Sequence, residues 1–277
     1  KQLLEKRNSH NFKTSTYLDY NASAPLDPAV IGAFEKNCRE DWSNPASLHS
    51  GGIQAWKKIE EARAALAEYF RWPSAESVFF CSGGTEGLRT LIDGFAVGAG
   101  LRPIITTASD HASVYRPLRI LRMSGRRDIR IIGVDYSGKV VPEELEEAAS
   151  GQGPGILIYS PVNHETGAIQ DTALLYKTVK SRGGLVFLDA VQAAARLKPS
   201  LWAPFCDGFV ISGHKIYAPK GTGALLLKPG VKLPRGPNLL PAAQGLFPGT
   251  PNSPGIAALA QAVRLLDPEK EGVYLRA

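Results

Sequence analysis

The sequence predicts an α/β fold in which a mostly parallel central sheet carries helices on both faces. Apolar runs of strand length alternate along the chain with longer segments of helical period, and Gly, Pro and Asp residues separate them. Most of the strand-like runs are apolar throughout and do not alternate with polar residues. This pattern is typical of strands that are covered on both faces, as in a parallel sheet between two layers of helices.

The expected strands are short apolar runs, each ending in a polar or glycine-rich turn: 77–81, 103–107, 129–134, 155–160, 184–189, 208–212 and 223–228. Helices are expected between them, over 51–70, 85–97, 142–149 and 171–182, and again from residue 256. The first helix has an apolar face whose members recur at spacings of three and four: Ile53, Trp56, Ile59, Ala62, Leu66 and Phe70.

At 277 residues, 44% of them hydrophobic, the chain can bury the core of one large domain with or without a small one. The interpretation divides it into an N-terminal arm (1–16), a large domain (17–250) and a closing segment (251–277) in which a helix resumes. The proline-rich stretch 228–255 is the expected linker. A boundary there leaves only a short remnant of a second domain.

Composition argues against several classes of protein. The chain contains no run of 18 apolar residues and its start has no apolar signal region, so we expect neither a membrane protein nor a secreted one. The net charge of +6 is scattered and lacks an aromatic-basic module, so nucleic acid is not an expected partner. Cys38, Cys81 and Cys206 are widely spaced, which predicts no disulfide framework or metal site and favours the reducing cytoplasm.

Ligands of open α/β sheets bind beyond the carboxyl ends of the strands, so the polar residues that follow each strand are the site candidates. After 77–81 comes "SGGTEG", in which Gly84 and Thr85 open a helix with outward backbone N–H groups. Such a turn can bind an anion, or it can be only a tight turn. After 103–107 comes His111, a candidate site residue or a helix cap.

Three further strands end in polar residues. The strand 155–160 is followed by Asn163, His164 and Glu165, which a plain loop could equally contain. The strand 184–189 ends in Asp189, with Gln192 on the same turn. A carboxylate inside a sheet requires a cationic or hydrogen-bonding partner, although Asp189 could instead cap a helix beginning near residue 190.

The strand 208–212 ends in "SGHK", which contains Ser212, His214 and Lys215. Read alone, this is a turn with a solvated lysine. Together, the strand ends supply a phosphate cradle, a carboxylate, a ring-stacking candidate and a lysine. Pyridoxal phosphate needs this set, because a lysine holds its aldehyde, a buried carboxylate keeps its ring nitrogen protonated, and donors hold its phosphate. A dehydrogenase needs a different glycine pattern, and a phosphotransferase needs a P-loop or metal-binding carboxylates; neither is found in this sequence.

The chain resembles the cysteine desulfurases, within the class V aminotransferase group of fold-type I pyridoxal-phosphate enzymes. The matching segments follow one another over nearly the whole chain: "YLDYNASAPLDPAV", "NPASLHSGG", "CSGGTEG", "SDHASV", "VNHETGAIQD", "FLDAVQ", "SGHKIYAPKGTGAL" and "GTPNSPGIAALAQA". The resemblance implies that Lys215 carries the cofactor and moves the substrate α-proton, that Asp189 pairs with the pyridine nitrogen, and that His111 stacks on the ring.

The resemblance assigns further cofactor contacts. It places Asn163 and Gln192 at the ring hydroxyl, and it assigns the phosphate to Gly84, Thr85, Ser212 and His214. Thr250 resembles the residue that such enzymes lend to the phosphate of the neighbouring subunit, which implies a homodimer. The implied substrate is L-cysteine, converted to L-alanine, with sulfur passed to an acceptor or scaffold protein as in iron–sulfur cluster assembly.

Two departures from the family affect the expected reaction. Phe247 and Pro248 stand where the family carries an arginine before Gly-Thr. The sequence also ends at Ala277, whereas the family continues into a small domain that bears the nucleophilic cysteine and a carboxylate-binding arginine, and no cysteine here falls at the catalytic position. We therefore expect no persulfide from this chain alone. Another class V reaction on a small amino acid, or a non-catalytic assembly partner, stays open as an alternative.

Overall fold

The computed structural model describes residues 16–98, 102–125, 127–150, 153–233, 246–247 and 249–267. The arm predicted over 1–16 lies outside the described residues except for Thr16. Residues 234–245 and 248 of the proline-rich stretch and the last ten residues of the closing segment also lie outside them.

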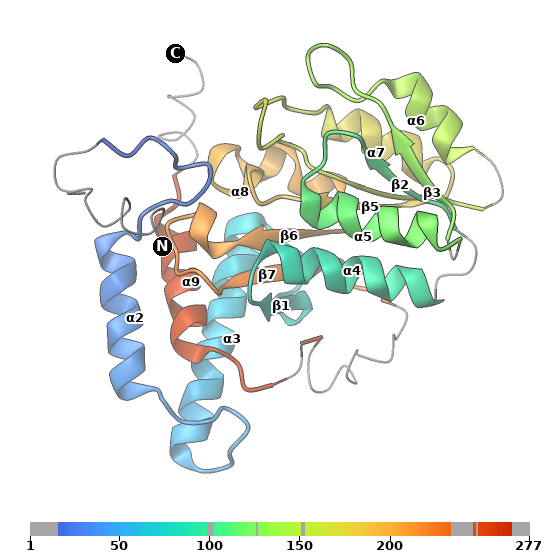
Figure 1. Cartoon of the computed structure of the whole chain (residues 1–277). Helices are drawn as coiled ribbons and strands as arrows, with labels where there is room; N and C mark the ends of the chain where they lie inside the picture. Colours follow the sequence, from blue (N-terminus) through green and yellow to red (C-terminus); the bar gives the residue numbers. More distant parts are fainter. Residues whose placement is uncertain are drawn as a thin grey trace, which may run out of the picture.

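Seven strands form one sheet in the order β1-β7-β6-β5-β4-β2-β3 (Figure 1). All seven correspond to predicted strands: β1 (Val78–Cys81), β2 (Ile104–Thr107), β3 (Ile129–Ile132), β4 (Ile156–Tyr159), β5 (Leu185–Asp189), β6 (Gly208–Ser212) and β7 (Gly223–Leu227). The strands from β3 to β6 in this order pair in parallel, while β7 is antiparallel to both of its neighbours, β6 and β1. The prediction of a mostly parallel sheet is confirmed.

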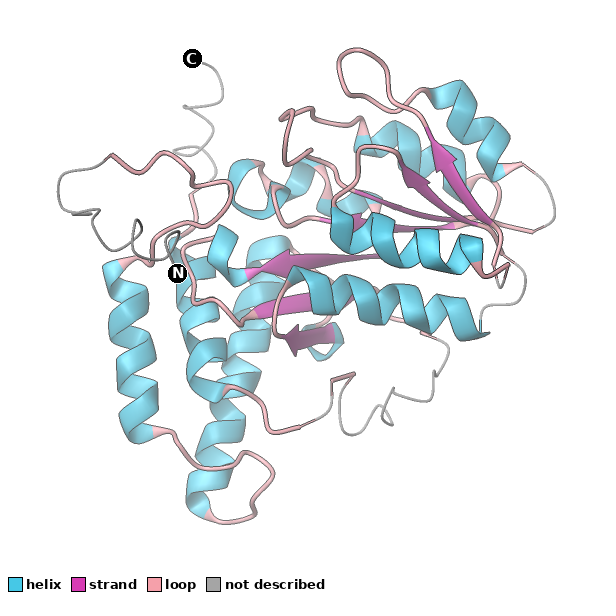
Figure 2. Ribbon diagram, viewed as in Figure 1, coloured by secondary structure: helices cyan, strands magenta, loops and turns pink. Residues whose placement is uncertain are grey.

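Helices cover both faces of the sheet, as Figure 2 shows. The helices of the described residues are α2 (Pro28–Glu40), α3 (Ser50–Phe70), α4 (Gly84–Gly98), α5 (Ala112–Met123), α6 (Pro142–Ala149), α7 (Thr172–Lys180), α8 (Ala193–Arg196) and α9 (Ser253–Leu265). None of them is long and apolar enough to cross a membrane.

Alternate residues of each strand pack into two separate cores. On β5, Val186 and Leu188 join the core beneath α3, α6, α7 and α9, whereas Phe187 joins the core beneath α4 and α5. All three side chains are fully buried. This two-sided burial explains why the strand sequences are apolar throughout.

Helix α9 begins at Ser253, where Asn252 caps it by accepting a hydrogen bond from the Gly255 N–H at 3.1 Å. The helix packs against α2 and α3 and contributes Ile256, Leu259 and Val263 to their core. The domain boundary predicted at residue 250 stays a prediction.

The carboxyl ends of β4, β5 and β6 reach the same edge of the sheet because these strands are parallel. The carboxyl end of β1 reaches it as well, since β1 and β6 are both antiparallel to β7. The fold therefore gathers the turns after these strands at one place.

Candidate functional site

A cavity of about 380 Å³ lies at this edge of the sheet. Most of the predicted site residues line it: Gly84, Thr85, His111, Asp189, Gln192, Ser212, His214 and Lys215. They come from the ends of β1, β2, β5 and β6 and are separated by up to 131 positions along the chain. The fold brings these residues together, as the strand-end argument predicted.

One end of the cavity, formed by the first turn of α4 with Ser212 and His214, has the features of an anion-binding site, and we call it the anion cradle. Gly84 and Thr85 form the first turn of α4, whose leading N–H groups have no acceptor within the helix. Gly83 precedes them at φ +150°, and a Cβ on Gly84 would lie 2.7 Å from Val191 Cγ2. The two glycines thus allow the turn to sit tightly against β5 and β6.

Two side chains of β6 and the turn after it complete the anion-binding end. The Ser212 hydroxyl and His214 Nδ1 are hydrogen-bonded at 3.0 Å. Burial first, and then the charges of Lys215 and Lys220, lower the pKa of His214. The N–H groups of the first turn of α4, the Ser212 hydroxyl and the charges of Lys215 and Lys220 therefore favour the binding of an anion at this end of the cavity.

Lys215 lies in the 3₁₀ turn Gly213–Lys215 that follows β6. Its half-buried amine is not simply solvated: Nζ donates to the backbone carbonyls of Asn21 at 2.5 Å and Ala22 at 2.8 Å. Burial is the main cause that lowers the Lys215 pKa, and the charge of Arg196 adds to it. A lowered pKa makes the neutral, nucleophilic amine more accessible near neutral pH.

Asp189 is the buried carboxyl of the site, with 5% of its surface exposed. Its Oδ1 accepts a hydrogen bond from the Val191 N–H at 3.2 Å. It does not cap a helix, because α8 starts at Ala193 with Gln192 in the capping position. Burial raises the pKa of Asp189 to about 7, and the buried Asp110 carboxyl adds to this effect. A carboxyl in this environment favours a cationic partner.

His111 both lines the cavity and caps a helix. Its Nδ1 accepts a hydrogen bond from the Ser113 N–H at 3.2 Å and lies 2.7 Å from the Ser113 hydroxyl. Its ring meets the His164 ring edge to face, with centroids 4.9 Å apart at 84°. Burial, then the charges of His164, Lys215 and Arg116, lower the His111 pKa. The ring is therefore biased toward the neutral form, which suits stacking.

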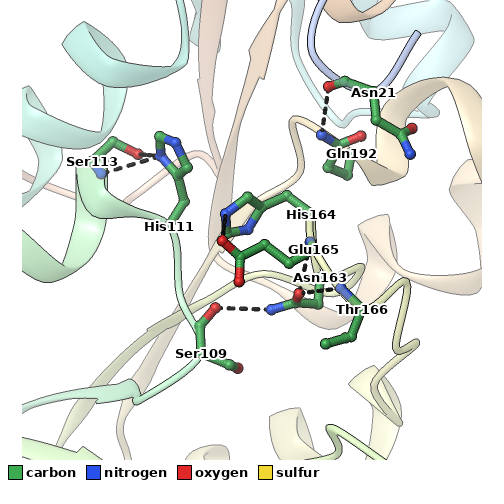
Figure 3. Close-up of polar contacts among 9 residues, drawn as sticks. All are labelled: Asn21, Ser109, His111, Ser113, Asn163, His164, Glu165, Thr166 and Gln192. Carbon is green, nitrogen blue, oxygen red and sulfur yellow. Dashed lines mark hydrogen bonds and ion pairs between the residues drawn. The ribbon is translucent and has the colours of Figure 1, made fainter. Parts of the chain in front are cut away.

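Asn163 does not line this cavity. Figure 3 shows that its amide contacts two loops: Oδ1 accepts from the N–H groups of Glu165 and Thr166 in its own loop at 2.9 Å each, and Nδ2 donates to the Ser109 carbonyl in the turn after β2 at 2.8 Å. The structure gives Asn163 the role of holding the loop after β4. Its predicted contact with a cofactor hydroxyl stays a prediction.

Thr250 is also separate from the main cavity. It is exposed and lines a second cavity of about 290 Å³ together with Phe247, Arg63 and Cys81. Its predicted role toward a neighbouring subunit remains a prediction, because the structure contains one chain.

His164, one of the polar residues noted after the strand 155–160, also lines the cavity. Several other lining residues were not predicted: Asp19, Asn21, Ala22, Ser113, Ser160, Val162 and Val191. Most of them flank predicted residues on the same turns, so the strand-end argument extended by two residues would have found them. The segment containing Asp19 and Asn21 precedes the first helix and follows no strand. Only the family resemblance of "YLDYNASAP" indicated that this segment could belong to the site.

The residues present fit pyridoxal phosphate. The cavity combines the N–H groups of the first turn of α4, the Ser212 and His214 side chains, a lysine amine and a buried carboxyl. Burial raises the pKa of Asp189 even though the charge of Lys215 acts to lower it, and a protonated ring nitrogen would supply a further cationic partner. The donor set and the electrostatics of the site therefore match this cofactor.

Comparison with known proteins agrees with the site. A model of the aminotransferase class-V family matches residues 16–272. A cysteine desulfurase from a Nostoc species is 35% identical over 257 residues, which cover 90% of this chain and 62% of that protein. The cysteine desulfurase IscS of Dictyoglomus turgidum is 34% identical over 265 residues, which cover 94% of this chain and 66% of that protein. The chain thus spans about two thirds or less of these relatives.

Solved structures agree with these relatives. A NifS-like protein superposes with a TM-score of 0.83 at 31% identity, covering 94% of this chain and 71% of that one. SspA in complex with cysteine superposes with a TM-score of 0.82 at 25% identity, covering 91% and 73%. The fold, the residues at the strand ends and the family match over 16–272 lead to one conclusion: the chain belongs to the class V aminotransferase family, whose members depend on pyridoxal phosphate.

Proposed function

We propose that this chain forms the cofactor-binding part of a pyridoxal-phosphate-dependent cysteine desulfurase, which converts L-cysteine to L-alanine and passes the sulfur to an acceptor. The observation that carries the proposal is the placement of the Lys215 amine and the buried Asp189 carboxyl in one cavity that ends in an anion cradle. The relatives named cysteine desulfurase, and a neighbouring structure named as a complex with cysteine, support the choice of substrate.

When bound, pyridoxal phosphate supplies an electron sink for the charge that develops at the substrate α-carbon. The first turn of α4, with Ser212 and His214, would hold the phosphate. Asp189 would hold the proton on the ring nitrogen, since its carboxylate gains a cationic partner there. His111 would cover one face of the ring with its neutral imidazole.

Lys215 has the chemistry for proton transfer. Its Nζ accepts a proton only when neutral, and its lowered pKa makes that form more abundant near neutral pH. Burial and the charge of Arg196 lower the Lys215 pKa, and the carboxylates of Asp19 and Asp189 act in the opposite direction. The site can therefore take a proton from a substrate carbon and return it.

The sulfur-accepting thiol is not assigned to this cavity, because none of the three cysteines lines it. Cys206 is buried and its pKa is raised by burial, so it is a core residue as predicted. Burial likewise raises the pKa of Cys81 to about 12. Neither thiol is suited to form the thiolate that sulfur transfer needs. We keep the prediction that this chain alone does not form persulfide.

We extend the proposal to a cytoplasmic homodimer that works with a sulfur acceptor or a scaffold protein in iron–sulfur cluster assembly. The exposed Thr250 supports a dimer, because a residue shared with a neighbouring subunit has to reach the surface. The three unpaired cysteines support a reducing compartment. Sedimentation of the purified chain tests the dimer, and a single monomeric species at all concentrations contradicts it.

The cofactor and substrate proposals are tested by absorption spectra. The purified chain is mixed with pyridoxal phosphate and then with L-cysteine, L-serine or L-alanine, beside a Lys215→Ala variant. We expect a visible band that requires Lys215 and changes most with L-cysteine. A band of equal size in the variant contradicts the role of Lys215, and a stronger response to L-serine favours another class V reaction.

A further inference from the structure

A segment that the proposed function leaves unused runs along the cavity wall. We call residues 17–24 the strap. It is folded on itself, since the Tyr17 hydroxyl lies within hydrogen-bond distance of the carbonyls of Asp19 at 2.8 Å and Ser23 at 2.9 Å and shares its single hydrogen between them. The N–H groups of Ala22 and Ser23 also donate to the Asp19 carbonyl, at 3.1 and 3.2 Å. The strap is thus a structured turn with protected amides.

Asn21 connects the strap to the site through three side chains. Its carbonyl accepts from Lys215 Nζ at 2.5 Å and from Gln192 Nε2 at 3.1 Å, the second of which is drawn in Figure 3. Its side-chain Oδ1 accepts from Arg196 Nη2 at 2.7 Å. With the Ala22 carbonyl, which accepts from Lys215 at 2.8 Å, the lysine amine gives two hydrogen bonds to the strap. Two of these donors carry full charges, so these bonds are the strong ones.

Attachment of a cofactor to Lys215 cannot leave both of the lysine's hydrogen bonds to the strap in place. Condensation of the neutral Lys215 amine with an aldehyde forms one C=N bond, releases one water molecule and leaves at most one hydrogen on the nitrogen. The amine needs two hydrogens to donate to Asn21 and Ala22 together. At least one of the two bonds is therefore lost when the lysine is occupied, by counting donors alone.

The far end of the strap is attached in a way that does not involve the lysine amine. The Ala24 N–H donates to the His214 carbonyl at 2.8 Å, and the Asp27 N–H donates to the Tyr217 carbonyl at 3.3 Å. These backbone bonds remain when Lys215 reacts. The strap thus has one end fixed by backbone and a central part, around Asn21, that depends on side chains of the site.

We propose that Asn21 is a positioning residue for Lys215, and that the strap is held closed by the free lysine amine and loosens when the cofactor occupies it. This inference rests on the proposed attachment of pyridoxal phosphate to Lys215. In the cofactor-free chain the strap holds the amine in the cavity. In the loaded chain at least one of the Lys215 bonds to Asn21 and Ala22 is lost, the contacts of Asn21 with Gln192 and Arg196 remain, and the strap opens more often.

Hydrogen exchange of the peptide that contains the strap tests this inference on the cofactor-free chain. Lys215→Met keeps the aliphatic stem of the side chain and removes both hydrogen bonds to the strap, so exchange at residues 20–23 is expected to rise roughly tenfold or more, while the Ala24 amide stays protected by the His214 carbonyl. Asn21→Ala removes the Oδ1 bond to Arg196 and is expected to raise exchange by a smaller factor. Arg196→Met removes that bond together with the bond from Arg196 to the Gln192 carbonyl, and it is expected to raise exchange at least as much as Asn21→Ala does. Lys177→Met, at an exposed position on α7, is the matched control and leaves the strap unchanged.

The same measurement with pyridoxal phosphate completes the test. The wild-type strap is expected to exchange faster once the Lys215-dependent absorption band has formed, while the Lys215→Met strap is fast in both states. A band that forms without a change in strap exchange overturns this inference and leaves the proposed function intact. Absence of the band overturns the proposed function. Slow exchange in cofactor-free Lys215→Met overturns the inference whether or not the cofactor binds.

Discussion

The Asp189 carboxyl gives the most quantitative prediction about this site. Asp189→Asn keeps the shape of the side chain and an oxygen that can accept the Val191 N–H bond, but it removes the ionisable group. The change therefore isolates the cost of a buried negative charge in the cofactor-free chain. We expect the variant to be more stable than the wild type at neutral pH and weaker in binding the cofactor.

The size of the effect follows from the raised pKa. The Asp189 pKa moves from the ordinary value of 3.8 to about 7 in the folded chain. Between these two pH values the folded state binds the proton that the unfolded state has lost, so stability falls as pH rises. This rise in the Asp189 pKa corresponds to at most about 4 kcal/mol of unfolding free energy, and the full loss applies at pH values above the pKa of Asp189 in the folded chain. Below pH 4 both states are protonated and the cost vanishes.

Urea unfolding of both cofactor-free proteins, followed from pH 4 to pH 8, measures this difference. The free-energy gain of Asp189→Asn should be near zero at the acidic end and increase toward neutral pH. Pyridoxal phosphate should reverse the order of stabilities, because it gives the wild-type carboxylate a cationic partner. A gain that is independent of pH would refute the argument that Asp189 is a buried acid with a raised pKa.

Two further predictions concern the anion cradle and the lysine. Gly223→Ala places a Cβ 2.6 Å from the Gly83 backbone, so we expect a loss of about 1–3 kcal/mol in unfolding free energy and weaker phosphate binding. The control Gly32→Ala meets no neighbour in α2 and should stabilise the chain by about 0.5–1 kcal/mol. Equal changes in the urea unfolding free energy of the two variants would contradict the argument that the added Cβ crowds Gly83. Arg196→Met removes a charge that lowers the Lys215 pKa. The pH at which the lysine begins to capture pyridoxal phosphate should therefore rise, and stopped-flow absorbance that shows an unchanged or lower pH would contradict this assignment.

The strands were predictable because both faces of the sheet are buried. Each predicted run overlaps its strand closely, since an apolar run with turn residues at both ends has few alternatives in a chain of this length. Helix α2 was not among the predicted helices, although residues 29–34 are mostly apolar. Its start could have been found, because Asp27 caps the helix and Pro28 occupies its first turn. The antiparallel direction of β7 has no local signature.

The site residues that directly follow a strand could be predicted from the sequence. Lys215, Asp189 and the α4 turn each follow a strand, so topology alone places them together. The contacts of Asn21 could not be predicted, because it meets Lys215 across 194 positions of sequence and no periodicity encodes such a pair. Asn163 shows the opposite case: its position suggested a ligand contact, yet its amide is occupied by two hydrogen bonds within its own loop and one to the Ser109 carbonyl after β2.

The central claim is that Lys215 holds pyridoxal phosphate in this cavity. The most direct measurement is borohydride reduction of the chain loaded with pyridoxal phosphate, followed by peptide mass mapping. The account predicts that the reduced cofactor is found on Lys215 and not on the exposed Lys220, which lies on the same turn. Labelling spread over surface lysines, with Lys215 unmodified, would contradict it.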